Sequence, residues 1–296
     1  MPLLNDPTAR DEDYCALRDD HQLRAQRDAL EQLWDFFDGS RLSEQGSRER
    51  CKRSLHTVFW EMLVAEALVE ADLGPSRPRG EGMPDFVFEK DGQRCWVEAV
   101  TAGRGDGENQ LPDWRLDDRP LPAIDLAVLR MTQALNTKRD QHARMLARGS
   151  VSPNDRYVIA LNTGKLRPFV YDPGYPPFFT RAVLPIGPLI VRIDRATGRF
   201  VGFRVELEPE LRNANDAPVA RHGFLSDDWM FCSALFHSPA TALSVPGADE
   251  SGMAVLRNPR ASNPLSLEGW EGRWALHDVA VHGNTSFDIV RQDRLI

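Results

Sequence analysis

The chain has 296 residues, of which 42% are hydrophobic and 27% charged, values ordinary for a globular protein large enough to bury a substantial core. Its net charge of −8 argues against a protein that coats nucleic acid with its whole surface, although a local basic cleft is compatible with that sum. No apolar run approaches the length of a transmembrane helix, and the start lacks the features of a signal peptide. We therefore expect a cytoplasmic protein with no membrane partner.

Three long helices are expected before residue 150. Residues 1–20 are strongly charged and are expected to be poorly ordered, whereas residues 22–37 carry an apolar stripe at helical spacing. A second helix is expected over residues 47–71, and the Gly- and Pro-containing segment that follows ends it. A third helix over residues 124–148 leads into a buried strand at 156–162. A helix that precedes an apolar strand in this way predicts a crossover connection within a sheet.

Two short apolar runs between the second and third helices each carry one acidic residue. Residues 84–88 contain Asp85 and residues 95–100 contain Glu98, and Asp91-Gly92 between them is a strong hairpin-turn signal. An ionised acid in an apolar strand carries a desolvation cost that a bound divalent cation offsets. Two such carboxylates that converge are the minimum equipment for metal-assisted hydrolysis of a phosphodiester. The same geometry could also hold a metal or a polar network without chemistry.

The remainder of the chain, residues 166–296, is rich in proline and contains scattered strand-like runs. They lie at residues 189–193, 200–207, 230–236 and 253–256. The expected fold class is α/β or α+β, with a central mixed sheet flanked by helices. We divide it into an N-terminal helical segment (1–45), a core (46–165) and a β-rich extension (166–296). This extension either continues the same domain or forms a small appended one, and the lack of a flexible linker favours the first.

The core residues resemble the PD-(D/E)XK nuclease superfamily, which has the restriction-endonuclease-like fold. A Pro-Asp pair ends at Asp85, a Glu-Ala-Val run begins at Glu98, and a helical Trp-Glu pair ends at Glu61. The family core is a helix, a three-stranded meander, a helix and a fourth strand, similar to the order predicted for residues 54–163. The short motif occurs often by chance, so the order of elements supports the resemblance more than the motif does.

The resemblance implies a metal-dependent endonuclease that hydrolyses nucleic acid, with DNA favoured over RNA. By the family pattern, Asp85, Glu98 and the backbone carbonyl of Ala99 are metal ligands. Glu61, an acid on the first core helix, belongs to the same metal site and binds the ion directly or through water. Hard oxygen ligands favour Mg²⁺ or Mn²⁺ over Zn²⁺ as the cofactor. The long loop over residues 101–122 would face the substrate. A homodimer is an open possibility, because two sites would serve to cut both strands of a duplex.

One position departs from the family pattern, since the motif lysine is replaced by Val100. Valine can neither orient an attacking water nor stabilise charge on phosphoryl oxygens. A cation from the third helix is one solution, because Arg130, Lys138 and Gln141 share a face at helical spacing. Family members often carry a glutamine there, so Lys138 and Gln141 join the two acids as candidate catalytic residues. The alternatives are a binding module that has lost catalysis, or an effector subunit active only with a partner protein.

Overall fold

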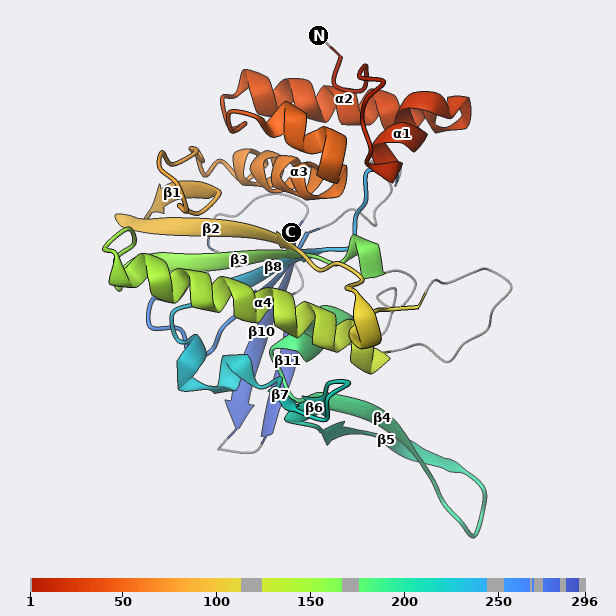
Figure 1. The fold of residues 1–296 in the computed structure, drawn as a ribbon. Coiled ribbons are helices and arrows are strands. Elements are labelled where there is room, and N and C mark those ends of the chain that lie inside the picture. The colour runs from red at the N-terminus through yellow and green to blue at the C-terminus, as the bar shows by residue number, and fades with distance from the viewer. Residues whose placement is uncertain are drawn as a thin grey trace.

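The computed structural model describes residues 2–112, 124–166, 176–243, 253–266, 268, 274–282 and 286–292. Within these residues a mixed sheet of seven strands runs in the order β1-β2-β3-β8-β9-β10-β11 through the centre of the molecule (Figure 1). The strands span Phe86–Lys90, Gln93–Thr101, Arg156–Asn162, Ala234–Ser238, Met253–Arg257, Trp274–His282 and Ser286–Gln292, in that order. Helices lie on both faces, which confirms the predicted mixed α/β sheet flanked by helices.

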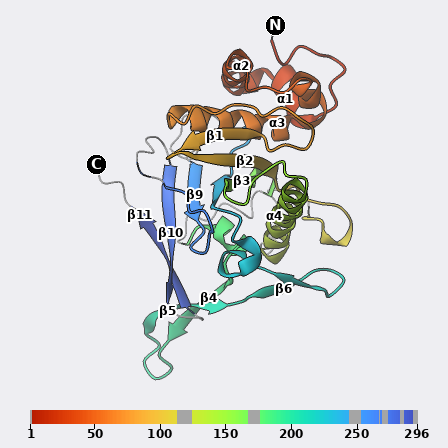
Figure 2. The same ribbon diagram turned by 90° about the vertical axis from the view of Figure 1, so that its left-hand side faces the viewer.

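The helices form one layer on each side of the sheet (Figures 1 and 2). Helices α1 (Glu12–Asp19), α2 (Arg24–Gly39) and α3 (Ser47–Glu70) lie together on one side, and α4 (Ile124–Ala147) lies on the other. The three predicted helices are thus confirmed to within a few residues. None of the helices among the described residues is long and apolar enough to cross a membrane.

The expectation of a poorly ordered N-terminus is wrong. Residues 12–19 form α1, and the side chains of Leu3, Tyr14 and Leu17 are buried in the core shared with α2 and α3. Asp11 caps the helix by accepting a hydrogen bond from the Tyr14 amide at 3.0 Å. The segment is ordered despite its many charges because these few apolar side chains are buried against α2 and α3.

Strands β1 and β2 form the predicted antiparallel hairpin, and Asp91 and Gly92 at its turn both have positive φ, as the preferred two-residue turn requires. Ser76 adds an isolated antiparallel bridge on the outer side of β1, bonded to Val87 in both directions at 2.8 and 2.9 Å. After α4 the chain returns as β3, which pairs with β2 in parallel. The crossover expected from the sequence is therefore confirmed.

Alternation along β2 assigns each side chain to one face. Cys95 and Val97 lie in the core under α1–α3, whereas Trp96 lies in the core under α4. Glu98, two residues after Trp96, therefore shares the α4 face. On the opposite face the Trp60 indole of α3 donates a hydrogen bond of 2.8 Å to the Ala160 carbonyl of β3, which fixes α3 against the sheet.

The second half of the chain continues the same sheet and adds two ribbons. Strand β8 pairs with β3 in parallel, and β9, β10 and β11 follow outward. The ribbons are β4 (Ile186–Ile193) with β5 (Phe200–Leu207), and β6 (Glu210–Arg212) with β7 (Pro218–Ala220). The strand expected at 230–236 begins only at Ala234, because a short 3₁₀ helix and turn precede it, and β10 and β11 were not predicted. The domain division stays a prediction.

Candidate active site at the open end of the β1–β2 hairpin

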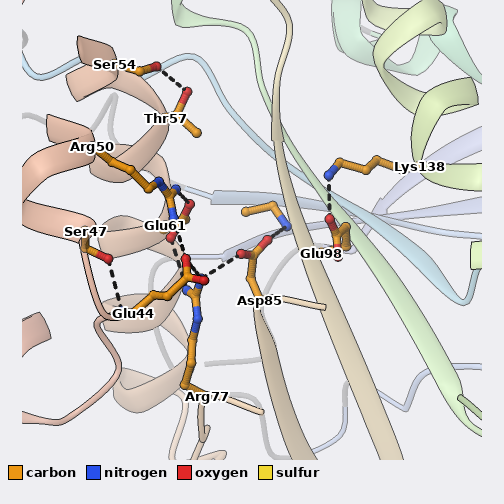
Figure 3. Close-up of polar contacts among 11 residues, drawn as sticks. Glu44, Ser47, Arg50, Ser54, Thr57, Glu61, Arg77, Asp85, Glu98 and Lys138 are labelled. Carbon is orange, nitrogen blue, oxygen red and sulfur yellow. Dashed lines mark hydrogen bonds and ion pairs between the residues drawn. The ribbon is translucent and has the colours of Figure 1, made fainter. Parts of the chain in front are cut away.

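The two acids predicted from the hairpin lie opposite each other at its open end. Phe86 of β1 pairs with Val97 of β2, so the same register carried one step further sets Asp85 opposite Glu98. Strand β1 begins just after Asp85, whereas β2 continues to Thr101. The end of β2 therefore extends beyond β1. The Asp85 side chain takes the place of a strand partner there, because its Oδ2 accepts a hydrogen bond of 2.8 Å from the Ala99 amide (Figure 3).

The same contact fixes the direction of the Ala99 carbonyl. Within a strand, the N–H and C=O groups of one residue point to the same side, which is why paired residues exchange both bonds. Since the Ala99 amide points at Asp85, its carbonyl oxygen faces the same edge. The Ala99 carbonyl and the Asp85 carboxylate therefore lie at the same edge of β2, and Glu98 is the residue that precedes Ala99.

Helix α4 brings a cation and an amide to Glu98. The Lys138 amine donates a hydrogen bond to Oε1 of Glu98 (Figure 3). It also lies 3.2 Å from the side-chain oxygen of Gln141. The Glu98 side chain is 4% exposed, and its Oε2 has no hydrogen-bond partner of good geometry among the described residues. Arg130, the third residue of the predicted face, bonds instead to the Gly103 carbonyl and the Gln133 side chain, at 2.9 and 2.7 Å.

Two arginines that sequence reasoning missed bind the acids on the α3 side. Arg77, in the loop after α3, donates to Glu61 Oε2 and to Asp85 Oδ1, at 3.1 Å each (Figure 3). Arg50 of α3 forms an ion pair with the other oxygen of Glu61. Both arginines also contact Glu44, at 2.7 Å from Arg50 and 3.3 Å from Arg77. Glu61 is thus brought towards Asp85 through a shared arginine.

Burial dominates the protonation of the three acids. It raises the pKa of Glu98 to about 7, and the neighbouring charge of Asp85 acts in the same direction against Lys138 and Gln141. Burial also raises the pKa of Asp85, against the opposing charge of Arg77, and that of Glu61, which the Asp85 charge raises further. Acids whose pKa is raised by burial and by one another are typical of functional sites, although ion-pair networks share the property.

The oxygens at the open edge of β2 meet only some of the requirements of a divalent-cation site. Among the described residues, no group of three or more Asp, Glu, His or Cys side chains is arranged to hold a metal ion. The acids are instead neutralised by Arg50, Arg77 and Lys138. Two carboxylates and one carbonyl at one strand edge nonetheless fit Mg²⁺, which binds few protein oxygens and keeps several waters. Oε2 of Glu98, which has no hydrogen-bond partner within the described part of the chain, is a buried oxygen that a cation would satisfy.

The loop expected to face the substrate is described only in part. Residues 101–112 follow β2 directly and include Arg104, which donates to the Leu111 carbonyl at 3.1 Å. The rest of that predicted loop, from residue 113 onwards, lies outside the described residues.

Comparison with family models, with curated proteins and with solved structures found no match to this chain. The interpretation of the site therefore depends on its own chemistry. The site combines two carboxylates on paired strands, a strand-edge carbonyl, a half-buried amine and two arginines. Such a set of groups can bind a cation and an anionic ester side by side.

Proposed function

We propose that this protein is a divalent-metal-dependent nuclease with a restriction-endonuclease-like core, a divergent PD-(D/E)XK member that hydrolyses phosphodiester bonds of nucleic acid, DNA in preference to RNA. The order of α3, the Ser76 bridge, β1, β2, α4 and β3 supports it, because it follows the helix, meander, helix and strand of that core. The contact of Lys138 with Glu98 carries the proposal. It supplies from α4 the cation that Val100 cannot supply from β2.

Asp85, Glu98 and the Ala99 carbonyl would hold Mg²⁺ or Mn²⁺ at the open edge of β2. The bound ion supplies Lewis acidity and lowers the pKa of water at the reaction centre. Lys138, which contacts Glu98, would stabilise the charge that develops on the phosphoryl oxygens. Gln141 keeps the amine within hydrogen-bond distance of this position.

The α3 side supplies the remaining charges. Arg77 bridges Glu61 and Asp85, and its guanidinium would compete with a cation for Asp85. A guanidinium at this place is suited to a phosphate, which it binds with two parallel hydrogen bonds. Glu61 holds the two arginines and would contact the cation through water.

The experiment is a cleavage assay on supercoiled DNA and on RNA with Mg²⁺ or Mn²⁺, using the isosteric variants Asp85→Asn and Glu98→Gln. Both variants are expected to lose cleavage by at least about a hundredfold while keeping the fold, since each removes charge but little volume. Glu89→Gln, an exposed acid on β1 of the same hairpin, is the matched control and is expected to leave cleavage unchanged. Full activity in either site variant would refute the proposal.

A second candidate function is a nucleic-acid or protein binding module, or an effector subunit that acts only with a partner. The ion pairs favour it, because carboxylates already neutralised by Arg77 and Lys138 have less need of a cation. Titration calorimetry with Mn²⁺ separates the two candidates. Binding that is lost in Glu98→Gln supports the nuclease, whereas no binding by the folded wild-type chain supports the second candidate.

A further inference from the structure

A two-stranded ribbon projects from the body of the molecule on the side away from α1–α3 (Figures 1 and 2). This arm, residues 186–207, consists of β4 and β5 paired antiparallel. Every residue from 191 to 201 is exposed. Large apolar side chains take part in this exposure, with exposed fractions of 52% for Val191, 59% for Ile193, 57% for Phe200 and 61% for Val201. An apolar surface left in water at this scale is typical of an interaction site.

The base of the arm is fixed to the body. Arg221, whose side chain is almost fully buried, forms an ion pair of 2.6 Å with Glu208 and donates to the Ile186 carbonyl where β4 begins. Gly187 allows the two strands to approach closely, because a Cβ there would lie 2.7 Å from the Glu206 carbonyl oxygen. The arm is therefore held at a defined position on the protein.

The tip is also held in one shape, by hydrogen bonds within the turn. The Asp194 amide donates to the Arg199 carbonyl at 2.8 Å. Oδ1 of Asp194 accepts from the amides of Ala196 and Thr197, at 2.9 and 2.8 Å. A ribbon ordered at both ends loses little conformational entropy when it binds, which favours a binding role.

The charge of the arm is opposite to that of the protein. Arg192, Arg195 and Arg199 are all exposed, and none of them forms an ion pair with any residue that the structure describes. Residues 191–201 carry these three arginines against one aspartate, a net charge of +2 in a chain whose net charge is −8. The arm is thus a basic projection on an acidic protein, and it attracts a polyanion.

The distribution of side chains decides between a polyanion and a second copy of the chain. Val191 and Ile193 lie two residues apart on one face of the ribbon, and Ile193 pairs with Phe200. Arg192 lies on the other face, with Arg195 and Arg199 in the turn. Two arms packed on each other through their apolar faces would cover those faces but would leave Arg192 of each arm pointing away from the contact. A nucleic-acid duplex satisfies both kinds of side chain.

We propose that the arm is a nucleic-acid-binding element that enters a groove of duplex DNA. The major groove of B-DNA admits a two-stranded ribbon, so the arginines contact phosphates while the apolar face lies against sugars and thymine methyl groups. This inference rests on the proposed function and deepens it, because it names duplex DNA as the substrate. It also assigns substrate binding to the arm and cleavage to the separate site at Asp85 and Glu98.

The test is fluorescence anisotropy of a labelled DNA duplex with the full chain carrying Glu98→Gln, which leaves the DNA uncut. The triple variant R192A/R195A/R199A is compared with R24A/R144A/R148A, which removes two exposed arginines from α2 and α4 and a third from the turn after α4. The slope of log K against log salt is expected to fall by about 2.7 in the arm variant, since each phosphate contact contributes about 0.9. The helix variant is expected to keep the wild-type slope.

Equal slopes in the two triple variants, or no duplex binding by the parent chain, would overturn the inference. So would a concentration-dependent dimer in light scattering that I193S/F200S dissolves without weakening DNA binding, because the arm would then serve a second copy. The outcomes also separate the two proposals. If the chain cuts DNA and the arm variant binds DNA as well as its parent, only the proposed role of the arm is refuted. If DNA binding depends on the arm but the chain neither binds Mn²⁺ nor cuts DNA, only the proposed nuclease activity is refuted.

Discussion

The Lys138 amine of α4 is hydrogen-bonded to the Glu98 carboxylate of β2, two residues before Val100. Glu98 and Val100 lie on the same face of the strand, so a lysine from the helix reaches the position that a lysine at residue 100 would serve. The cation of the site is thus carried by an element distant in sequence, and exchanging the two positions tests this directly.

Under the proposed function, Lys138→Ala is expected to lower cleavage by about a hundredfold, because it would remove a charge that stabilises the transition state. Introducing Val100→Lys into that variant is expected to restore at least about a tenth of the activity, since the new amine extends from the same strand face. V100M/K138A is the matched control, with similar length and no charge. Activity is measured by single-turnover cleavage. Equal recovery in the methionine variant would show that the positive charge does not account for the contribution of Lys138.

Replacing Arg77 is expected to raise the affinity for Mn²⁺ and to lower the rate of cleavage. Arg77→Gln frees Asp85 and Glu61 from their shared cation, so Mn²⁺ affinity measured by calorimetry should rise by about tenfold, or about 1.4 kcal/mol. Cleavage should nevertheless fall, because the guanidinium is lost as a phosphate ligand. Arg53→Gln, an exposed arginine of α3, is the control. Unchanged or weaker Mn²⁺ binding in the Arg77 variant would exclude competition between the two cations.

The raised pKa of Glu98 predicts a pH-dependent stability. The pKa is about 7 in the folded chain against 4.5 for the free side chain, so the folded state binds more protons between these values. Its contribution is therefore present below pH 4.5 and is lost as the pH rises to about 7. In the presence of a chelator, the free energy of unfolding of the wild type is expected to fall by about 2 kcal/mol more than that of Glu98→Gln across this range. The measurement is urea unfolding of both chains at several pH values. An equal change in the free energy of unfolding with pH in the two chains would contradict this.

The hydrogen bond from the Trp60 indole of α3 to the Ala160 carbonyl of β3 is expected to contribute to the free energy of unfolding. Trp60→Phe leaves the Ala160 carbonyl without its indole donor and is expected to reduce the free energy of unfolding by about 2 kcal/mol. Trp34→Phe, at another buried indole of the same helical layer, removes similar atoms and no hydrogen bond to a described residue, so it should cost less. A larger loss in the Trp34 variant by chemical denaturation would mean that packing, and not the hydrogen bond, anchors α3.

Much of the candidate site was predictable because local sequence encodes it. Alternation along residues 95–100 and the Asp-Gly turn together set Asp85 opposite Glu98. Helical spacing identified the face of α4 that carries Lys138 and Gln141. The same spacing failed for Arg130, because eight residues of helix separate it from Lys138 by roughly 12 Å, and only part of one helix face can oppose a single carboxylate.

The arginines of the α3 side could not be predicted in this way. Arg77 lies in an irregular loop with no periodicity, and it meets Glu61 and Asp85 only because the Ser76 bridge ties that loop to β1. Arg50 and Glu61 share one helix, but a kink at Ser54, where φ is −156° and ψ is 64°, lies between them. Sequence spacing says nothing about how such a kink redirects a side chain.

The sequence by itself determined the three long helices, the hairpin and the crossover into β3, because turn chemistry and hydrophobic period act between residues close in the chain. It also determined that two acids would face each other at one strand edge. Only the tertiary structure decided which cations reach those acids, and that β8–β11 extend the sheet while β4 and β5 leave it as an arm. These outcomes depend on contacts between distant segments, whose free energies are set by packing and burial in the complete fold and leave no local pattern.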